Sequence, residues 1–158
     1  QMKILLLFLL LIQNPLEVLL DKGYDEYSSG EYIEALHTFK EAMDLDPDNA
    51  EIYFLRGLTH FGLENIRESV EGFEKAIELN PDYQDAWQEL GYVYLVSQAP
   101  DRAVEAYDKA ITLSPETAEL YVNRGTAKCM MNDIDGAETD WAVAKKLGVD
   151  YGEMMKCE

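Results

Sequence analysis

One spacing relates five columns of residues along the chain, and this period constrains the fold more than any other feature. The proline column advances by thirty-four residues without an insertion, from Pro47 to Pro81 and Pro115. Four further columns keep the same step: Gly23, Gly57, Gly91 and Gly125; Ala35, Ser69, Ala103 and Ala137; Ala42, Ala76, Ala110 and Ala144; and the aromatic residues Phe39, Phe73, Tyr107 and Trp141. Self-similarity at a fixed period of this length is the signature of a repeat array. We therefore place four repeats at residues 16–49, 50–83, 84–117 and 118–151.

Each repeat is predicted to form two antiparallel helices. Its apolar residues follow a 3.6-residue period, and turn residues interrupt the pattern twice. The predicted helices span residues 16–28, 32–45, 50–62, 66–79, 84–97, 101–113, 118–131 and 134–147. Asn14 before Pro15 predicts an N-cap with proline in the first helical position. The prolines of the column end each hairpin, because proline cannot continue the preceding helix. The predicted fold class is all-α, an α-solenoid of four helical hairpins.

The columns also have a packing explanation. Helices approach to about 8–10 Å where small side chains meet, and the glycine column on the first helices and the Ala42 column on the second helices supply such contacts. We expect the aromatic column to fill the wedge between one hairpin and the next. A single hairpin cannot bury its own apolar face, so stacking of the repeats must build the core.

The third repeat resembles the tetratricopeptide repeat family almost without change. The resemblance rests on Trp87, Leu90, Gly91, Tyr94, Ala103, Tyr107, Ala110 and Pro115. The other repeats depart from the pattern, with Arg56 and Arg124 in place of leucine, Glu26, His60 and Lys128 in place of tyrosine, and Val149 in place of the last proline. The resemblance implies antiparallel helical hairpins stacked in a superhelix, and Val149 indicates that the fourth unit ends differently from the others.

By this resemblance, inward-facing positions of the first helices line a concave peptide-binding groove. The groove residues are Leu20, Tyr24, Tyr27, Phe54, Leu58, Phe61, Gln88, Tyr92, Leu95, Val122, Thr126 and Cys129. An acidic border beside them is formed by Glu17, Asp21, Glu51, Asp85, Glu89 and Glu119. The lining is mainly apolar and aromatic, although some of these side chains are expected to belong to the core between helices.

Family members that hold the acidic C-terminal tails of heat-shock chaperones use lysine, arginine and asparagine on this surface. Here Leu20, Tyr24, Leu55, Asp85 and Glu89 occupy the corresponding places, so a carboxylate clamp in the groove is not expected. The sequence favours a non-enzymatic interaction module that binds apolar or apolar-plus-basic peptide segments of a protein partner. The alternative is a self-assembling, homo-oligomeric scaffold.

Composition excludes several other classes of function. A formal charge of -18 repels nucleic acid and anionic membrane surfaces. His37 and His60 lie on different hairpins and beside no candidate nucleophile, and no glycine-rich phosphate loop is present. Cys129 and Cys157 are expected to be free thiols. We therefore expect no enzyme activity, catalytic residue, cofactor or metal site.

The amino-terminal residues 1–15 form an apolar leader. Its run from Ile4 to Ile12 resembles a signal-peptide core, although no pair of small residues follows for a signal peptidase, and it is too short to span a membrane. Membrane contact is therefore expected only through residues 4–12. The sequence leaves the location open: it is expected to be cytoplasmic, or exported or membrane-associated if residues 2–12 act as a signal or an anchor. In solution the run is expected to pack on the array, most readily on that of a partner copy in a homodimer. At the other end, residues 152–158 are expected to form a short tail helix.

Overall fold

The computed structural model describes residues 14–149, 152 and 155–157. The described chain is helical throughout its repeats, in the order α2 (Pro15–Ser28), α3 (Tyr32–Leu45), α4 (Ala50–Gly62), α5 (Ile66–Leu79), α6 (Gln84–Val96), α7 (Pro100–Leu113), α8 (Ala118–Met130) and α9 (Ile134–Lys146). The predicted packing of the leader, residues 1–13, lies outside the described residues. Within the described part, no helix has both the length and the apolar character needed to cross a membrane.

The helix bounds agree with the sequence prediction to within one residue at every end. The predicted cap is confirmed at the start of α2, where the Asn14 side chain accepts a hydrogen bond of 3.1 Å from the Leu16 backbone N–H. Asn49 caps α4 in the same way, through the Glu51 backbone N–H at 3.0 Å. These side chains satisfy backbone donors that a helix leaves unpaired at its start.

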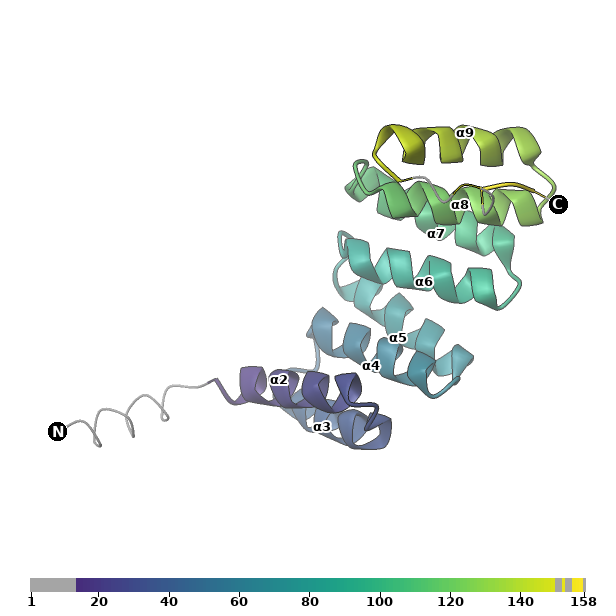
Figure 1. Cartoon of the computed structure of the whole chain (residues 1–158). Helices are drawn as coiled ribbons and strands as arrows, with labels where there is room; N and C mark the ends of the chain where they lie inside the picture. Colours follow the sequence, from purple (N-terminus) through teal and green to yellow (C-terminus); the bar gives the residue numbers. More distant parts are fainter. Residues whose placement is uncertain (1–13, 150–151, 153–154, 158) are drawn as a thin grey trace.

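The helices form four hairpins that stack in chain order, from α2 and α3 at one end to α8 and α9 at the other (Figure 1). Every helix contacts its successor, and α2, α4, α6 and α8 also contact one another in sequence. The all-α solenoid is therefore confirmed. The core runs through the stack as three clusters of buried side chains, centred on Phe39, on Phe73 with Tyr107, and on Trp141.

The aromatic column packs differently from the prediction. Each ring lies against the glycine of its own hairpin: a Cβ atom added at Gly91 would come within 2.9 Å of the Tyr107 ring, and one added at Gly57 within 2.8 Å of Phe73. The expectation that the rings mainly fill the wedge between hairpins was therefore incomplete. Phe73 and Tyr107 are fully buried and belong to a cluster that continues into neighbouring repeats, so each ring joins the two helices of one hairpin and also supports the stack.

The second hairpin contains an additional close approach. A Cβ atom added at Gly72 of α5 would lie 2.8 Å from the Gly57 Cα atom and 3.0 Å from the Tyr53 carbonyl oxygen of α4. Backbone therefore meets backbone at this point, and only glycine fits without moving a helix. The corresponding positions of the other hairpins carry Thr38, Ala106 and Asp140.

The carboxyl-terminal end corrects a second prediction. Cys129 and Cys157 are joined in a disulfide, with 5.6 Å between their Cα atoms, so they are not the free thiols that the sequence indicated. Met155 is buried against the cluster of Trp141 and Ala144. The tail thus covers apolar surface at the end of the array. The predicted tail helix stays a prediction, since residues 150–151, 153–154 and 158 lie outside the described part.

Candidate protein-interaction surface

The predicted groove residues all lie on the first helices of the hairpins, α2, α4, α6 and α8, and none of them is buried. Tyr24 is 52% exposed and Tyr92 is 40% exposed. These are large fractions for aromatic side chains, which bury about 150–250 Å² each when they are enclosed. The first three hairpins therefore present aromatic surface that the described part of the chain leaves uncovered.

Ring contacts connect this surface along the array. The Phe61 and Tyr92 rings meet edge to face, with 5.7 Å between their centroids, and join α4 to α6. On α2, the centroids of Tyr24 and Tyr27 are 6.2 Å apart, and Tyr27 lies 5.9 Å from Tyr32 of α3. Pairs at these distances stabilise one another beyond their buried area. The rings therefore form two groups in an aromatic layer, Tyr24 with Tyr27 and Tyr32, and Phe61 with Tyr92.

A hollow of about 640 Å³ opens in this layer. It brings together two predicted groove residues, Tyr27 and Phe61, with three residues that the sequence did not indicate, Tyr32, Ile66 and Val96. Tyr32 and Ile66 start second helices, where no groove was expected, and Val96 lies at the last position of α6. A signal for Tyr32 is present in the sequence but was not used: Gly62 makes room for its ring, which lies 2.6 Å from the place a Cβ atom would take.

Other predicted groove residues also support the core. The Phe54 ring lies 5.7 Å from that of buried Phe73 and 5.0 Å from that of Tyr83. Leu20, Leu58 and Leu95 pack against the buried clusters as well. Substitution of these residues is expected to change stability together with any binding, whereas Tyr24 and Tyr92 are the members with the most exposed surface.

The fourth hairpin differs from the first three. Cys129 is in the disulfide, and Val122 packs with the cluster that contains Met155 of the tail. The Thr126 hydroxyl donates to the Val122 carbonyl oxygen at 3.0 Å, within its own helix. All three predicted groove residues of this hairpin are thus engaged inside the chain.

The acidic border surrounds the third of these first helices most closely. Glu17, Asp21, Glu51, Asp85 and Glu119 are exposed, and Glu89 is half-buried. Burial raises the pKa of Glu89, and the nearby Asp85 raises it further, while a hydrogen bond with Gln88 acts in the opposite direction.

The carboxylates of the border contribute to the raised pKa of nearby tyrosine side chains. Burial raises the pKa of Tyr83 to about 12, with Glu51 and Asp85 contributing. The pKa of Tyr27 is raised by burial, by Tyr32 and then by Glu89. Glu89 therefore lies within electrostatic range of the hollow and gives it a negative potential.

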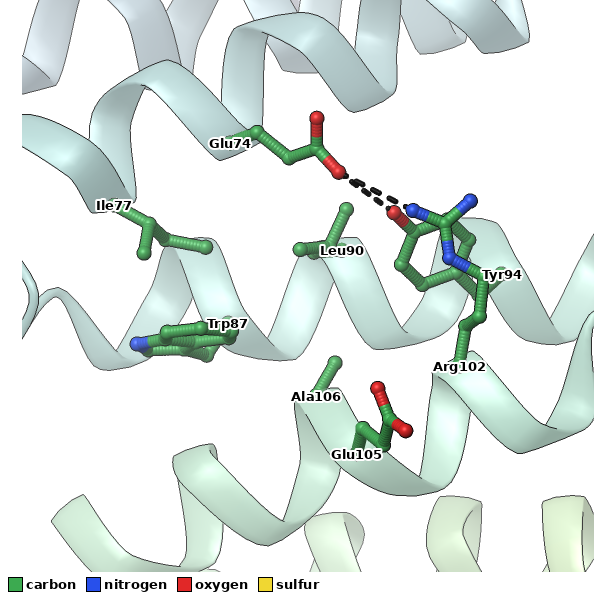
Figure 2. A pocket seen from close by; sticks show the side chains of 8 residues that line it. All are labelled: Glu74, Ile77, Trp87, Leu90, Tyr94, Arg102, Glu105 and Ala106. Carbon is green, nitrogen blue, oxygen red and sulfur yellow. Dashed lines mark hydrogen bonds and ion pairs between the residues drawn. The ribbon is translucent and has the colours of Figure 1, made fainter.

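A separate recess of about 220 Å³ lies between α5, α6 and α7, away from the predicted groove residues (Figure 2). The Tyr94 hydroxyl donates to a Glu74 carboxylate oxygen at 2.9 Å, and the Arg102 guanidinium lies 3.3 Å from the same oxygen. The Arg102 guanidinium also lies 4.1 Å from the centre of the Tyr94 ring. Burial raises the pKa of Tyr94 to about 12, and its hydrogen bond to Glu74 makes the next largest contribution in the same direction. The polar groups on this side of the recess are therefore paired with one another.

The chain matches two families of known proteins. Residues 23–64 match the family described as TPR repeat, and residues 56–118 match the family described as tetratricopeptide repeat. No curated protein sequence matches the chain.

Solved structures share the fold over most of the chain. One described as the crystal structure of MamA is 30% identical, with a TM-score of 0.80 over 85% of this chain and 78% of that one. A second, described as the crystal structure of MamA protein, is 29% identical, with a TM-score of 0.78 over 84% and 73% of the two chains. A third, described as MamA 41-end from Desulfovibrio magneticus RS-1, is 21% identical, with a TM-score of 0.76 over 85% and 76%, and shows the fold alone.

These matches and the stacked hairpins support a scaffold for protein–protein interaction as the general function. The repeat register, the glycine and aromatic columns and the solenoid agree with both family matches and with the similar structures. The chain belongs to the tetratricopeptide repeat family.

Proposed function

We propose that the chain is a non-enzymatic module that binds an apolar-plus-basic peptide segment of a protein partner on the first helices of its first three hairpins. The observation that carries the proposal is the aromatic hollow, with Tyr27 and Phe61 in its lining and the half-buried carboxylate of Glu89 within electrostatic range. An apolar side chain gains free energy by covering the rings, at about 25 cal/mol per Å² of apolar surface removed from water.

Charge gives the surface its selectivity. The border residues Glu51, Asp85 and Glu89 are acidic, and a net charge of -18 adds a long-range field of the same sign. A lysine or arginine in the peptide is attracted to this border, and an acidic peptide is repelled. Because most of these carboxylates are exposed, salt is expected to weaken the discrimination.

A peptide array tests this proposal. The probes are short peptides that share one leucine-rich core and differ only in flanking lysine, glutamine or glutamate. The expected order of affinity is lysine, then glutamine, then glutamate, and the spread is expected to narrow as salt is raised from about 50 to 150 mM. Tighter binding of the glutamate peptides would contradict the proposed surface.

A second copy of the chain is the alternative occupant of the surface, because the leader carries the apolar run Ile4 to Ile12. Burying such side chains gains about 1.5–3 kcal/mol each. Light scattering of the full chain and of residues 14–158 separates the two functions. Self-assembly predicts a larger particle that becomes a monomer without the leader, together with stronger peptide binding by the shortened chain. If deletion of the leader changes neither the particle size nor the peptide affinity, self-assembly through the leader is excluded and the interaction module is the remaining function.

A further inference from the structure

The recess of the third hairpin has a counterpart in the second, one repeat earlier. That counterpart has a volume of about 210 Å³ and is lined by residues of α4 and α5. Residue pairs at the same repeat positions are Tyr53 and Trp87, Arg56 and Leu90, His60 and Tyr94, Glu68 and Arg102, Glu71 and Glu105, and Gly72 and Ala106. The repeat thus places equivalent recesses beside the second and third hairpins, and the residues at the same positions can be compared in the first and fourth.

In the fourth hairpin this position holds an internal carboxylate. Arg124 donates two hydrogen bonds to the two oxygens of Asp140, from Nε at 2.8 Å and from Nη2 at 2.6 Å. The Lys128 ammonium lies 2.9 Å from an Asp140 oxygen. The Asp140 side chain is 3% exposed, so a carboxylate is fully enclosed between two cations here.

In the first and third hairpins, polar groups near this position pair with one another. In the first, the Thr38 hydroxyl donates to Glu26 at 2.6 Å and accepts from Lys22 at 3.3 Å. In the third, Leu90 takes the position of Arg124, and Ala106 takes that of Asp140. Glu74 pairs there with Tyr94 and with Arg102 (Figure 2).

The second hairpin keeps nitrogen-bearing side chains at the two cationic positions but lacks the carboxylate. Arg56 occupies the repeat position of Arg124, His60 that of Lys128, and Gly72 that of Asp140. The buried Arg56 Nε and His60 Nδ1 atoms have no hydrogen-bond partner. One terminal nitrogen of Arg56 lies 3.0 Å from the sulfur of Met43, which is a weak acceptor. Glycine at position 72 supplies no carboxylate, and a recess of about 210 Å³ lined by Arg56, His60 and Gly72 lies on this side of the second hairpin.

We propose that this cavity is a binding site for a carboxylate group, which pairs with Arg56 and His60 as Asp140 pairs with Arg124 and Lys128 in the fourth hairpin. The ligand accepts hydrogen bonds from Arg56 and from the imidazole of His60. Two sources fit this chemistry, a small free carboxylate and the acidic side chain of a partner polypeptide. The cavity opens between α4 and α5 and includes Glu71, Gly72 and Lys75 of the second helix, so it is separate from the aromatic hollow.

Charged side chains of both signs line the cavity. Lys75 adds a cation to the lining, and Glu68 and Glu71 add two carboxylates. Glu68 is paired with Arg67 at 2.9 Å, and Lys75 with Glu78 at 2.8 Å. The net charge of -18 opposes any anion at long range, but at about 0.15 M salt exposed charges beyond about 8 Å are largely screened. Among the charges close to His60, that of Arg56 acts more strongly on the imidazole than that of Glu68 or Glu71.

Proton NMR of the two histidines tests the site in the full chain. His60 lines the cavity, whereas His37 lies exposed on α3 and serves as the internal reference. Burial lowers the pKa of His60, the charge of Arg56 lowers it further, and Glu68 and Glu71 act in the opposite direction. Sodium acetate, titrated against sodium chloride at constant ionic strength, is expected to move the His60 signals saturably, to raise the pKa of His60, and to leave His37 unchanged.

A second titration with N-acetyl-glutamate amide, and with its glutamine counterpart as control, distinguishes the sources. A response to acetate alone assigns a small free carboxylate, and a response to the glutamate compound as well assigns an acidic side chain. Arg56→Gln is expected to reduce the affinity about tenfold or more, because hydrogen bonds to charged groups contribute about 1.5–3 kcal/mol. Equal shifts at His60 and His37, or no shift with either carboxylate, would overturn the proposal.

The fourth hairpin supplies a variant that should gain the site. Asp140→Gly removes the internal carboxylate and leaves Arg124 and Lys128 facing an empty position. Acetate, but not chloride at equal ionic strength, is expected to raise the melting temperature of this variant. If acetate and chloride act alike on it, the equivalence between the two hairpins that underlies the proposal is wrong.

Discussion

The second and fourth hairpins share one backbone plan, yet their side chains are used in opposite ways. In the fourth, Arg124 and Lys128 enclose Asp140, and Cys129 is bonded to the tail. In the second, buried nitrogens of Arg56 and His60 have no hydrogen-bond partner, and Phe61 contributes to an open aromatic hollow. The fourth hairpin satisfies its own groups, and the second leaves groups that a ligand can satisfy.

This difference teaches how a repeat protein separates stability from binding. The shared columns, such as Gly57 with Phe73 and Gly125 with Trp141, hold every hairpin together in the same way. The positions outside those columns are free to differ between repeats. The fourth hairpin pairs its charged groups internally, and the second hairpin leaves buried nitrogens without a hydrogen-bond partner.

The largest expected effect is the difference in stability loss between substitutions of Arg124 and Arg56. Arg124→Met removes one partner of a buried ion pair and leaves the enclosed Asp140 with Lys128 alone, so unfolding free energy should fall by about 3 kcal/mol. Arg56→Met, the matched control in the second hairpin, removes no ion pair and should cost less than about 1 kcal/mol. Urea denaturation measures both. Equal losses would remove the contrast between the hairpins.

The shared columns give the next effect. Gly91→Leu forces a side chain against the Tyr107 ring, which lies 2.9 Å from the position of the first added atom, and overpacking should cost about 1–3 kcal/mol. Tyr92→Ala, one residue further along α6, is the control because its side chain is exposed. Thermal unfolding compares them. If Gly91→Leu melts at the wild-type temperature, the glycine–ring contact is not the common support.

The stability of the chain is expected to depend on pH through His60 but not through His37. Its pKa in the folded chain is lowered by burial and then by Arg56, so the unfolded chain binds more protons as the pH falls below the ordinary value of 6.5. Stability should therefore decline as the pH falls from above 6.5 through the lowered pKa. His60→Gln should flatten this part of the profile, whereas His37→Gln should not. A profile that is the same in all three proteins would show that His60 is not held against protonation.

The smallest effect concerns the border of the aromatic hollow. The pKa of Glu89 is raised by burial and by Asp85, so the folded chain disfavours the ionised form, and stability is lost as the pH rises above about 4.5. Glu89→Gln should therefore stabilise the chain slightly at pH 7, and the gain should vanish below pH 4.5. Chemical denaturation at the two pH values measures the difference. A loss of stability at pH 7 would mean that the carboxylate makes a favourable contact.

Sequence reasoning could recover the fold because its signals are local and repeated. The Asn14 and Pro15 pair, the proline column and the 3.6-residue period each act within one or two turns of chain, and four copies remove chance agreement. The helix bounds followed from these signals. The contact between each glycine and the aromatic ring of its own hairpin did not follow from these signals. Repeat spacing shows which positions are equivalent, but it does not show which side chains are in contact.

The site was harder to predict for the same reason. Tyr32 and Val96 enter the hollow from a second helix and from a helix end, so they fall outside any first-helix pattern. The bond between Cys129 and Cys157 depends on how the tail folds back, and no repeat fixes that path. Gly72 was overlooked because it belongs to no glycine column. The missing carboxylate at position 72 is recognised only by comparison with Asp140, two repeats later.

The most direct test of the account compares one repeat position in two hairpins. Tyr92 and Thr126 are equivalent, but Tyr92 is exposed beside Phe61, and the Thr126 hydroxyl bonds within its own helix. Calorimetric titration with a short leucine–lysine peptide should show an affinity about tenfold lower for Tyr92→Ala and unchanged for Thr126→Ala, as expected for an aromatic anchor. Equal losses, or a loss for Thr126→Ala alone, would contradict the claim that the first three hairpins bind the peptide while the fourth is closed.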